Sequence, residues 1–165
     1  MSVWIGIGAN QGDAVGYCRQ GLAWLAQHPD LVLLSHSSFY RTQPVGPIKD
    51  QPWFINLVCR LACRLEPIEL LELLQTFERR AGRNRTVQIP WGPRPLDLDL
   101  LFFHQRIIQA PNLKIPHPFL HLRRFVLRPL CDLDVGMPHP ILDKTVDMLL
   151  KEVDDSQVVE LIPGT

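Results

Sequence analysis

Two aspartates near the middle of the chain, Asp97 and Asp99, are separated by one leucine in the string LDLDL. On a β-strand, residues two apart point to the same face, so both carboxylates would face one side while the leucines are buried on the other. At a separation of about 6 Å the two charges repel by about 3 kcal/mol at an effective dielectric of 20. Bound Mg²⁺ would turn that repulsion into binding, because hard cations prefer oxygen ligands. A solvated polar strand face is the alternative that this pattern alone leaves open.

Arginines lie close to these aspartates in the sequence. The string WGPRP leads into the strand and supplies Arg94, and Arg83 and Arg85 come a few residues earlier. Residues 79–128 hold ten Lys or Arg and two acids, a local charge of +8 in a chain with zero net charge. The planar guanidinium group suits phosphate and carboxylate. Carboxylates that hold metal beside arginines that hold phosphate would serve phosphoryl transfer, where catalysis is mainly positioning and charge neutralisation.

Three further side chains could extend such a site. Glu78 lies in the last turn of a predicted helix, where a carboxylate opposes the helix dipole. It has either a partner in the site or an ion pair with a nearby arginine. His117 lies between two prolines and, with Arg123 nearby, could donate a hydrogen bond to a phosphate oxygen. Alone, a histidine of this kind is more often structural.

Aromatic and amide side chains follow a Pro-rich stretch. The string YRTQPVGPIKDQP at 40–52 is predicted as a long loop, which is a common place for function. Phe54 and Asn56 come just after it, and Phe125 lies further along the chain. Two aromatic rings with an amide suit a flat heterocycle that forms hydrogen bonds, although each ring alone would more often belong to a core.

Hydrophobic periodicity predicts the elements that carry these residues. Strands are expected over 3–7, 31–39, 54–65 and 96–103, and helices over 13–27 and 68–81. Their order is βαββαβ, the ferredoxin-like arrangement within the α/β class. After His104 the chain becomes rich in proline, with one helix expected over 142–151 and a loose tail. We therefore expect an α+β sandwich with a ferredoxin-like core and a Pro-rich C-terminal extension, forming a single domain over 1–165.

Composition excludes several classes of protein. With 46% hydrophobic and 21% charged residues, the chain is not a disordered tail. It has no apolar run of the roughly 20 residues that a membrane helix needs, and its start lacks the basic region of a signal peptide. Cys18, Cys59, Cys63 and Cys131 form no CxxC pair and are expected to be reduced core thiols. We expect a cytoplasmic monomer that binds neither nucleic acid nor a membrane.

Five blocks of the sequence resemble the 6-hydroxymethyl-7,8-dihydropterin pyrophosphokinase family. They are GANQGD at 8–13, FYRTQPVGPIKDQPWFIN at 39–56, GRNR at 82–85, WGPRPLDLDLLF at 91–102, and PHP with RRFVLRPL within 116–130. The resemblance implies transfer of a diphosphoryl group from ATP to the pterin hydroxymethyl group, leaving AMP. It also implies that two Mg²⁺ ions are held by Asp97 and Asp99.

The same resemblance assigns roles to individual residues. The implied pterin-binding residues are Thr42, Pro44, Val45, Phe54, Asn56, Trp91 and Phe125. The implied ATP-binding residues are Gln75, Glu78, Arg85, Arg94, His117 and Arg123. The implied catalytic residues are Arg83, Arg85, Arg94, Asp97 and Asp99, of which Arg83 and Arg85 fall with Trp91 in the family's mobile catalytic loop. The chain departs from the family pattern at Pro90, Phe119 and Leu122.

Two other classes of function are compatible with parts of the pattern. The order βαββαβ also hosts small RNA-binding modules, which need exposed stacking aromatics on the central strands. A metal-dependent nuclease could be built on Asp97, Asp99 and Glu78. The strand predicted over 54–65 offers only Phe54 for stacking, and the strand predicted over 96–103 offers only Phe102 and Phe103 at its end.

Overall fold

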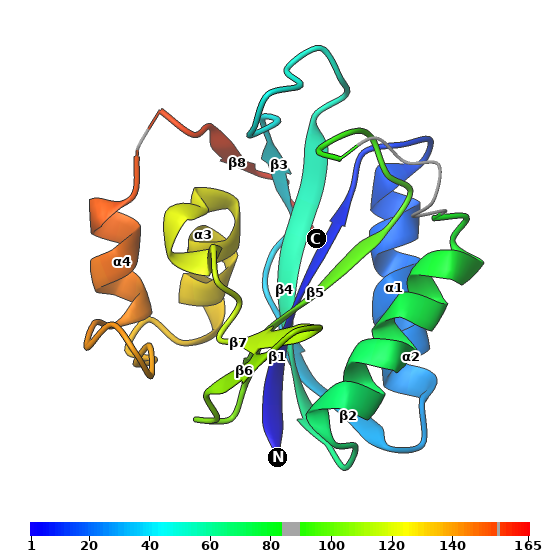
Figure 1. Ribbon diagram of the computed structural model, residues 1–165. Coiled ribbons are helices and arrows are strands. Elements are labelled where there is room, and N and C mark those ends of the chain that lie inside the picture. Colours follow the sequence, from blue (N-terminus) through cyan, green and yellow to red (C-terminus); the bar gives the residue numbers. More distant parts are fainter. Residues whose placement is uncertain (84–89, 155) are drawn as a thin grey trace.

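A central antiparallel sheet organises the molecule, seen in a computed structural model that describes residues 1–83, 90–154 and 156–165 (Figure 1). Five of the described strands follow the order β5-β1-β4-β3-β8, and β2 also pairs with β4. Their bounds are Ser2–Ala9 for β1, Leu31–His36 for β2, Tyr40–Thr42 for β3, Phe54–Cys63 for β4, Asp97–Phe103 for β5 and Val159–Leu161 for β8.

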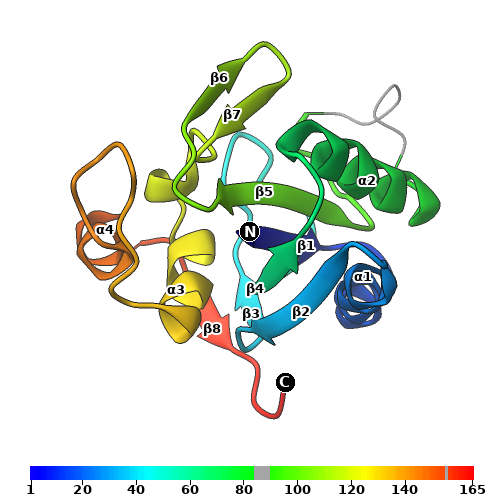
Figure 2. The same cartoon turned by 90° about the horizontal axis from the view of Figure 1, so that it is seen from below.

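Helices cover both faces of this sheet (Figures 1 and 2). On one face lie α1 (Ala14–Gln27) and α2 (Pro67–Arg80), and on the other lie α3 (Arg124–Leu133) and α4 (Val146–Glu152). Each pair of helices packs on its own hydrophobic cluster. The α1/α2 cluster includes Ile5, Ile7, Leu25, Leu57, Leu61 and Leu74. The α3/α4 cluster includes Trp4, Val58, Phe102, Val126, Leu130 and Leu149.

The ends of α1 and α2 follow local signals in the sequence. The Asp13 side chain accepts a hydrogen bond from the Gly16 N–H at 2.9 Å and caps α1, as predicted. Pro67 begins α2, where its missing N–H costs nothing. Gly82 follows α2 with φ of +92°, a conformation that glycine adopts without steric cost.

The region after His104 is more ordered than the predicted Pro-rich extension with one helix and a loose tail. It forms the hairpin of β6 (Ile108–Ala110) and β7 (Leu113–Ile115), the 3₁₀ turn η1 (Leu120–Leu122), α3, α4 and β8. Helix α3 was not predicted because it contains Pro129, which removes one intrahelical hydrogen bond and normally argues against a helix interior. The predicted helix over 142–151 starts later, at Val146, where the Thr145 side chain provides the cap.

Two strand predictions also need correction. The strand predicted over 31–39 ends at His36, and the stretch predicted as a loop over 40–52 begins with β3. Both faces of β4 are buried: Val58 packs against residues of α3, and Asn56 on the same face is buried as well. Period-two alternation indicates a strand, but it does not reveal a second helical layer.

The predictions on cysteines and membrane spans were also tested. Cys18, Cys59, Cys63 and Cys131 are all reduced and buried, as predicted, and burial raises the pKa of both Cys18 and Cys59 to about 12. In the described part of the chain, each helix is too short or too polar to cross a membrane.

Candidate active site

A pocket of about 360 Å³ opens where the end of β1 meets the beginnings of β4 and β5. Most of the predicted site residues line it. They are Thr42, Val45, Phe54, Asn56, Arg83, Trp91, Arg94, Asp97, Asp99, His117, Arg123 and Phe125. Pro44, Gln75 and Glu78 do not line this pocket, and Arg85 lies outside the described residues.

Gly8 lines the pocket on β1, the strand that lies between β4 and β5. It is in register with Asn56 on β4 and with Asp97 on β5. A Cβ atom at Gly8 would lie 2.7 Å from the Asn56 Oδ1, closer than real Cβ contacts occur. Any other residue here would therefore displace the Asn56 amide. In the sequence, Gly8 stands out only as the first residue of the block GANQGD, which does not reveal this role.

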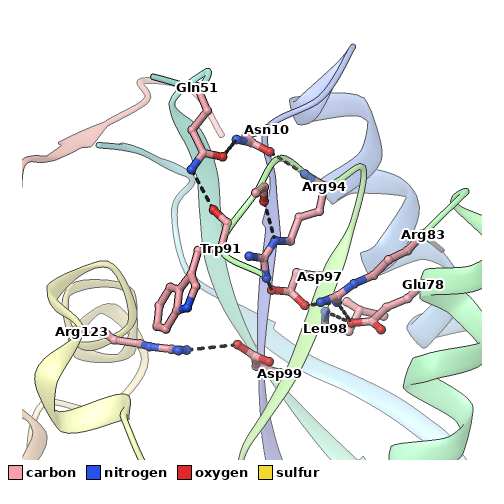
Figure 3. Close-up of polar contacts among 11 residues, drawn as sticks. Asn10, Gln51, Glu78, Arg83, Trp91, Arg94, Asp97, Leu98, Asp99 and Arg123 are labelled. Atoms are coloured by element: carbon pink, nitrogen blue, oxygen red, sulfur yellow. Dashed lines mark hydrogen bonds and ion pairs between the residues drawn. The ribbon is translucent and has the colours of Figure 1, made fainter. Parts of the chain in front are cut away.

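Asp97 is held by two arginines. Arg94 donates to its Oδ2 from Nη1 at 2.7 Å, and Arg83 bridges its other oxygen to the Glu78 carboxylate (Figure 3). Burial alone would favour the neutral carboxyl, but the Arg83 and Arg94 guanidinium groups outweigh it and hold the pKa of Asp97 below its usual range. Asp97 is therefore a fixed anion.

Glu78 is paired, as one of the two sequence interpretations held. It is 1% exposed, and its Oε1 accepts from the Leu98 N–H at 2.9 Å while pairing with Arg83. The backbone bond ties the end of α2 to β5, and the ion pair ties it to Arg83. Glu78 thus acts on the pocket through Arg83.

Asp99 shares the pocket-facing side of β5 with Asp97, but its electrostatic environment differs. Its Oδ2 lies 3.4 Å from Arg123 Nη1. Burial and the Asp97 charge raise the pKa of Asp99 to about 7, with the Arg123 guanidinium opposing the shift. The protein alone therefore does not fully stabilise a negative charge on Asp99.

His117 lies in the pocket as a neutral donor. Its Nδ1 accepts a hydrogen bond from the Phe119 N–H at 3.2 Å, which leaves the proton on Nε2. Burial and the nearby Arg123 lower the pKa of His117 to about 4, so the ring stays neutral at physiological pH. A neutral ring with one N–H can donate a single hydrogen bond without adding a charge.

Aromatic rings and an amide form the other wall of the pocket. Asn56 Nδ2 donates to Thr42 Oγ1 at 2.6 Å, which fixes the orientation of the amide. The guanidinium of Arg94 lies 5.8 Å from the Phe54 ring centre, and that of Arg123 lies 5.7 Å from the Phe125 ring centre. Each ring is thus paired with an arginine from the opposite, charged wall of the pocket, which holds Asp97, Asp99 and the arginines. The distances are typical of cation–π contacts.

Two amide side chains, buried Asn10 and partly buried Gln51, join the loops around the pocket, a role that the sequence pattern did not reveal. Asn10, 3% exposed, accepts from the Arg94 N–H at 2.8 Å and donates to Gln51 Oε1 at 3.0 Å (Figure 3). It also donates to Pro52 O at 2.9 Å. Gln51 Nε2 then donates to Trp91 O at 2.9 Å. The two amides place Arg94 and Trp91 relative to the Pro-rich loop.

Replacing Asn10 with alanine should lower the free energy of unfolding by about 2 kcal/mol, because three hydrogen bonds of a buried amide are lost. Turnover should fall as well, since the Arg94 backbone loses an anchor. Urea unfolding measures the first effect. Gln11→Ala, at the exposed neighbouring residue, is the matched control. A loss below about 0.5 kcal/mol for Asn10→Ala would contradict a bracing role for the amide pair.

The residues present fit a hard divalent cation. Asp97 and Asp99 offer carboxylate oxygens on one face, and the unfavourable charge at Asp99 would be relieved by a cation. In the described residues no group of three or more His, Cys, Asp or Glu could hold a metal. Two carboxylates suit Mg²⁺ that takes its other ligands from phosphate and water. The three-carboxylate nuclease site is not formed in the described part of the chain, because Glu78 does not line the pocket with Asp97 and Asp99.

An RNA-binding sheet surface is also excluded on the described strands. Phe102 and Phe103, the aromatics that β5 offers, are 1% and 0% exposed. Helices cover both faces of the sheet, so its central strands present no open stacking platform.

Comparison with known proteins agrees with this geometry. The family model described as 7,8-dihydro-6-hydroxymethylpterin-pyrophosphokinase (HPPK) matches residues 4–135. The chain belongs to this family. The resemblance expected from the five sequence blocks is thus confirmed. The matched range runs from β1 to just beyond the end of α3, so it includes the described residues that line the pocket.

Relatives of the HPPK family cover most of the chain. Two proteins named 2-amino-4-hydroxy-6-hydroxymethyldihydropteridine pyrophosphokinase illustrate this. The one from Bacillus subtilis is 43% identical over 130 residues, which are 79% of this chain and 76% of that protein. The one from Haemophilus influenzae is 34% identical over 165 residues, 99% of each chain. The crystal structure of Plasmodium falciparum HPPK-DHPS shares the fold, with a TM-score of 0.70 at 13% identity, and the match covers 91% of this chain and 45% of that one.

Proposed function

We propose that this protein transfers the diphosphoryl group of ATP to the hydroxymethyl group of 6-hydroxymethyl-7,8-dihydropterin, giving AMP and the pterin diphosphate in folate biosynthesis. Membership of the HPPK family supports this reaction. One structural observation carries the proposal: a single pocket joins an aromatic and amide wall to a wall of aspartates and arginines. The hydroxymethyl oxygen forms a bond to the β-phosphorus, and the bond from that phosphorus to the α–β bridging oxygen breaks. The electron pair of the broken bond leaves with AMP, and the hydroxyl proton passes to solvent.

The aromatic and amide wall suits the pterin. Phe54 and Phe125 supply flat apolar surfaces, and the Asn56 amide, held by Thr42, supplies hydrogen bonds for the heterocycle. Val45 and Trp91 line the same pocket, and we assign Pro44, the neighbour of Val45 in the chain, to the pterin side on the family pattern. The substrate hydroxymethyl group would then point towards the charged wall.

The charged wall suits the ATP phosphates. Arg94 and Arg123 offer guanidinium donors, and neutral His117 offers one N–H. Arg83, positioned by Glu78, belongs to the same wall. We assign Arg85 and Gln75 to the nucleotide side on the family pattern. Preorganised donors of this kind stabilise the charge that moves onto the leaving phosphate.

We assign two Mg²⁺ ions to Asp97 and Asp99. When bound, Mg²⁺ neutralises phosphate charge and aligns the reacting oxygens. The ion pair with Arg94 already orients the Asp97 carboxylate. The negative charge on Asp99 is not fully stabilised by the protein, so a bound cation would stabilise it.

We also infer that the core is ferredoxin-like and that the chain acts as a monomeric single domain. The order of the first elements and the sheet order β5-β1-β4-β2 support the former. The pocket supports a single domain, because residues from β1, β4, β5 and α3 line it together.

Product analysis tests the proposed reaction. With ATP, Mg²⁺ and 6-hydroxymethyl-7,8-dihydropterin, the protein should release AMP and pterin diphosphate in equal amounts. The matched control is 7,8-dihydropterin, which lacks the accepting hydroxyl group and should give no AMP. Omission of Mg²⁺ should also stop the reaction. Release of ADP, or AMP without the pterin, would overturn the proposal.

A further inference from the structure

The Gln157 side chain spans the two peptide groups that flank Arg123. Its Oε1 accepts a hydrogen bond from the Arg124 N–H at 2.9 Å, and its Nε2 donates to the Leu122 carbonyl at 3.1 Å. Gln157 is separated from these residues by more than 30 positions in the chain. It lies beyond residues 4–135, the part of the chain that the family model matches.

Arg123 occupies a junction of the backbone that needs such support. It is both the residue that ends η1 and the N-cap of α3, with an extended conformation and no side-chain cap hydrogen bond. The first N–H groups of a helix have no acceptor within the helix. Gln157 supplies one for Arg124, and it holds the preceding carbonyl of Leu122 at the same time.

Fixing both neighbours of Arg123 fixes the direction in which its side chain leaves the backbone. That side chain reaches into the pocket, where its Nη1 lies 3.4 Å from Asp99 and its guanidinium lies 5.7 Å from the Phe125 ring centre. A small change in the direction of the Arg123 Cα–Cβ bond moves the guanidinium group by a larger distance, because the side chain is long. Catalysis and phosphate binding are sensitive to displacements of about 1 Å.

Gln157 is itself held from the other wall of the pocket. The next residue, Val158, accepts a hydrogen bond at its carbonyl from the Gln43 N–H at 3.2 Å. Beyond it, β8 pairs with β3, placing Val159 opposite Thr42, the partner of Asn56. The segment 157–161 therefore connects the wall around Asn56 to the wall around Arg123.

We propose that Gln157 is a positioning residue, which holds Arg123 in place for the nucleotide phosphates through the Leu122 and Arg124 peptide groups. The proposal rests on the proposed function, because it takes Arg123 as a phosphate-binding residue. Gln157 itself does not line the pocket with Arg123, so its effect on the nucleotide is indirect.

Gln157→Ala should weaken binding of α,β-methylene-ATP with Mg²⁺ by about 3- to 10-fold, the effect of losing one or two neutral hydrogen bonds. Calorimetry measures this affinity, and the affinity for the pterin should change less than about 2-fold. Gln157→Glu keeps the acceptor for the Arg124 N–H but loses the donor to the Leu122 carbonyl. Its affinity for α,β-methylene-ATP should therefore lie between that of the wild-type protein and that of Gln157→Ala. Gln20→Ala, at an exposed position on α1, is the matched control.

A double-mutant cycle separates positioning from a general structural role. In an Arg123→Ala background, adding Gln157→Ala should leave nucleotide affinity unchanged, because the group that Gln157 positions is gone. The proposal is overturned if Gln157→Ala binds the nucleotide as wild type does, or if its effect persists in that background. Failure of the wild-type protein to form AMP would instead overturn the proposed function.

Discussion

Replacing Asp99 with asparagine should reduce AMP formation by at least about 1,000-fold while the metal-free protein keeps or gains thermal stability. Asparagine has the same shape but no charge, so it removes the repulsion from Asp97 that raises the pKa of Asp99. It also removes an anionic ligand from the predicted Mg²⁺ site. Turnover is measured as AMP release, and the melting temperature is measured in EDTA.

The neighbouring aspartate provides the matched comparison. Asp97→Asn should also lose activity, but in EDTA its free energy of unfolding should fall by about 3 kcal/mol. The reason is that Arg83 and Arg94 would lose the carboxylate that pairs them. Equal destabilisation by the two substitutions would show that Asp99 is a structural residue and would contradict the interpretation of the pair.

Replacing Arg94 with lysine should leave no more than about 1% of kcat/KM, close to the effect of Arg94→Ala. The guanidinium contacts three groups in different directions: the Asp97 carboxylate at 2.7 Å, the Gly92 carbonyl at 3.3 Å and the Phe54 ring. A compact ammonium group cannot reproduce this planar arrangement, although it keeps the charge. Steady-state kinetics with each substrate varied measures the loss.

An exposed arginine supplies the control for this substitution. Arg79 on α2 donates to the Thr76 hydroxyl at 2.7 Å and does not line the pocket. Arg79→Lys should keep kcat/KM within about 2-fold of wild type, as expected for a surface substitution. If Arg94→Lys behaves in the same way, Arg94 contributes only its positive charge.

The framework of the site could be predicted from sequence because its signals are local. Alternation along β4 and β5, the Asp13 cap, and Pro67 and Gly82 at the ends of α2 all act within a few residues. Period-two geometry also places Asp97 and Asp99 on one face, which the structure confirms. Sequence spacing does not reveal, however, that the two aspartates differ in their electrostatic environment. Asp97 pairs with Arg83 and Arg94 only once the loops have folded.

The parts that could not be predicted depend on contacts between distant segments. Strands β3 and β8 have three residues each, too few to show a period, and they pair across more than a hundred residues. The Asn10 and Gln51 amides give no signal in the sequence, because their hydrogen-bond partners come from distant segments of the chain. Helix α3 was hidden by Pro129, which its packing against the sheet tolerates.

Gly8, which lines the pocket beside Asn56, limits the mutations by which this protein could become resistant to an inhibitor. A compound that fills the space beside Gly8 and binds the Asn56 amide would contact a position where every replacement carries a Cβ. That atom would fall 2.7 Å from the Asn56 Oδ1, so a mutation that excludes the compound would also disturb the group that we assign to substrate recognition. A substitution at Gly8 would therefore be expected to weaken binding of the pterin together with binding of the compound.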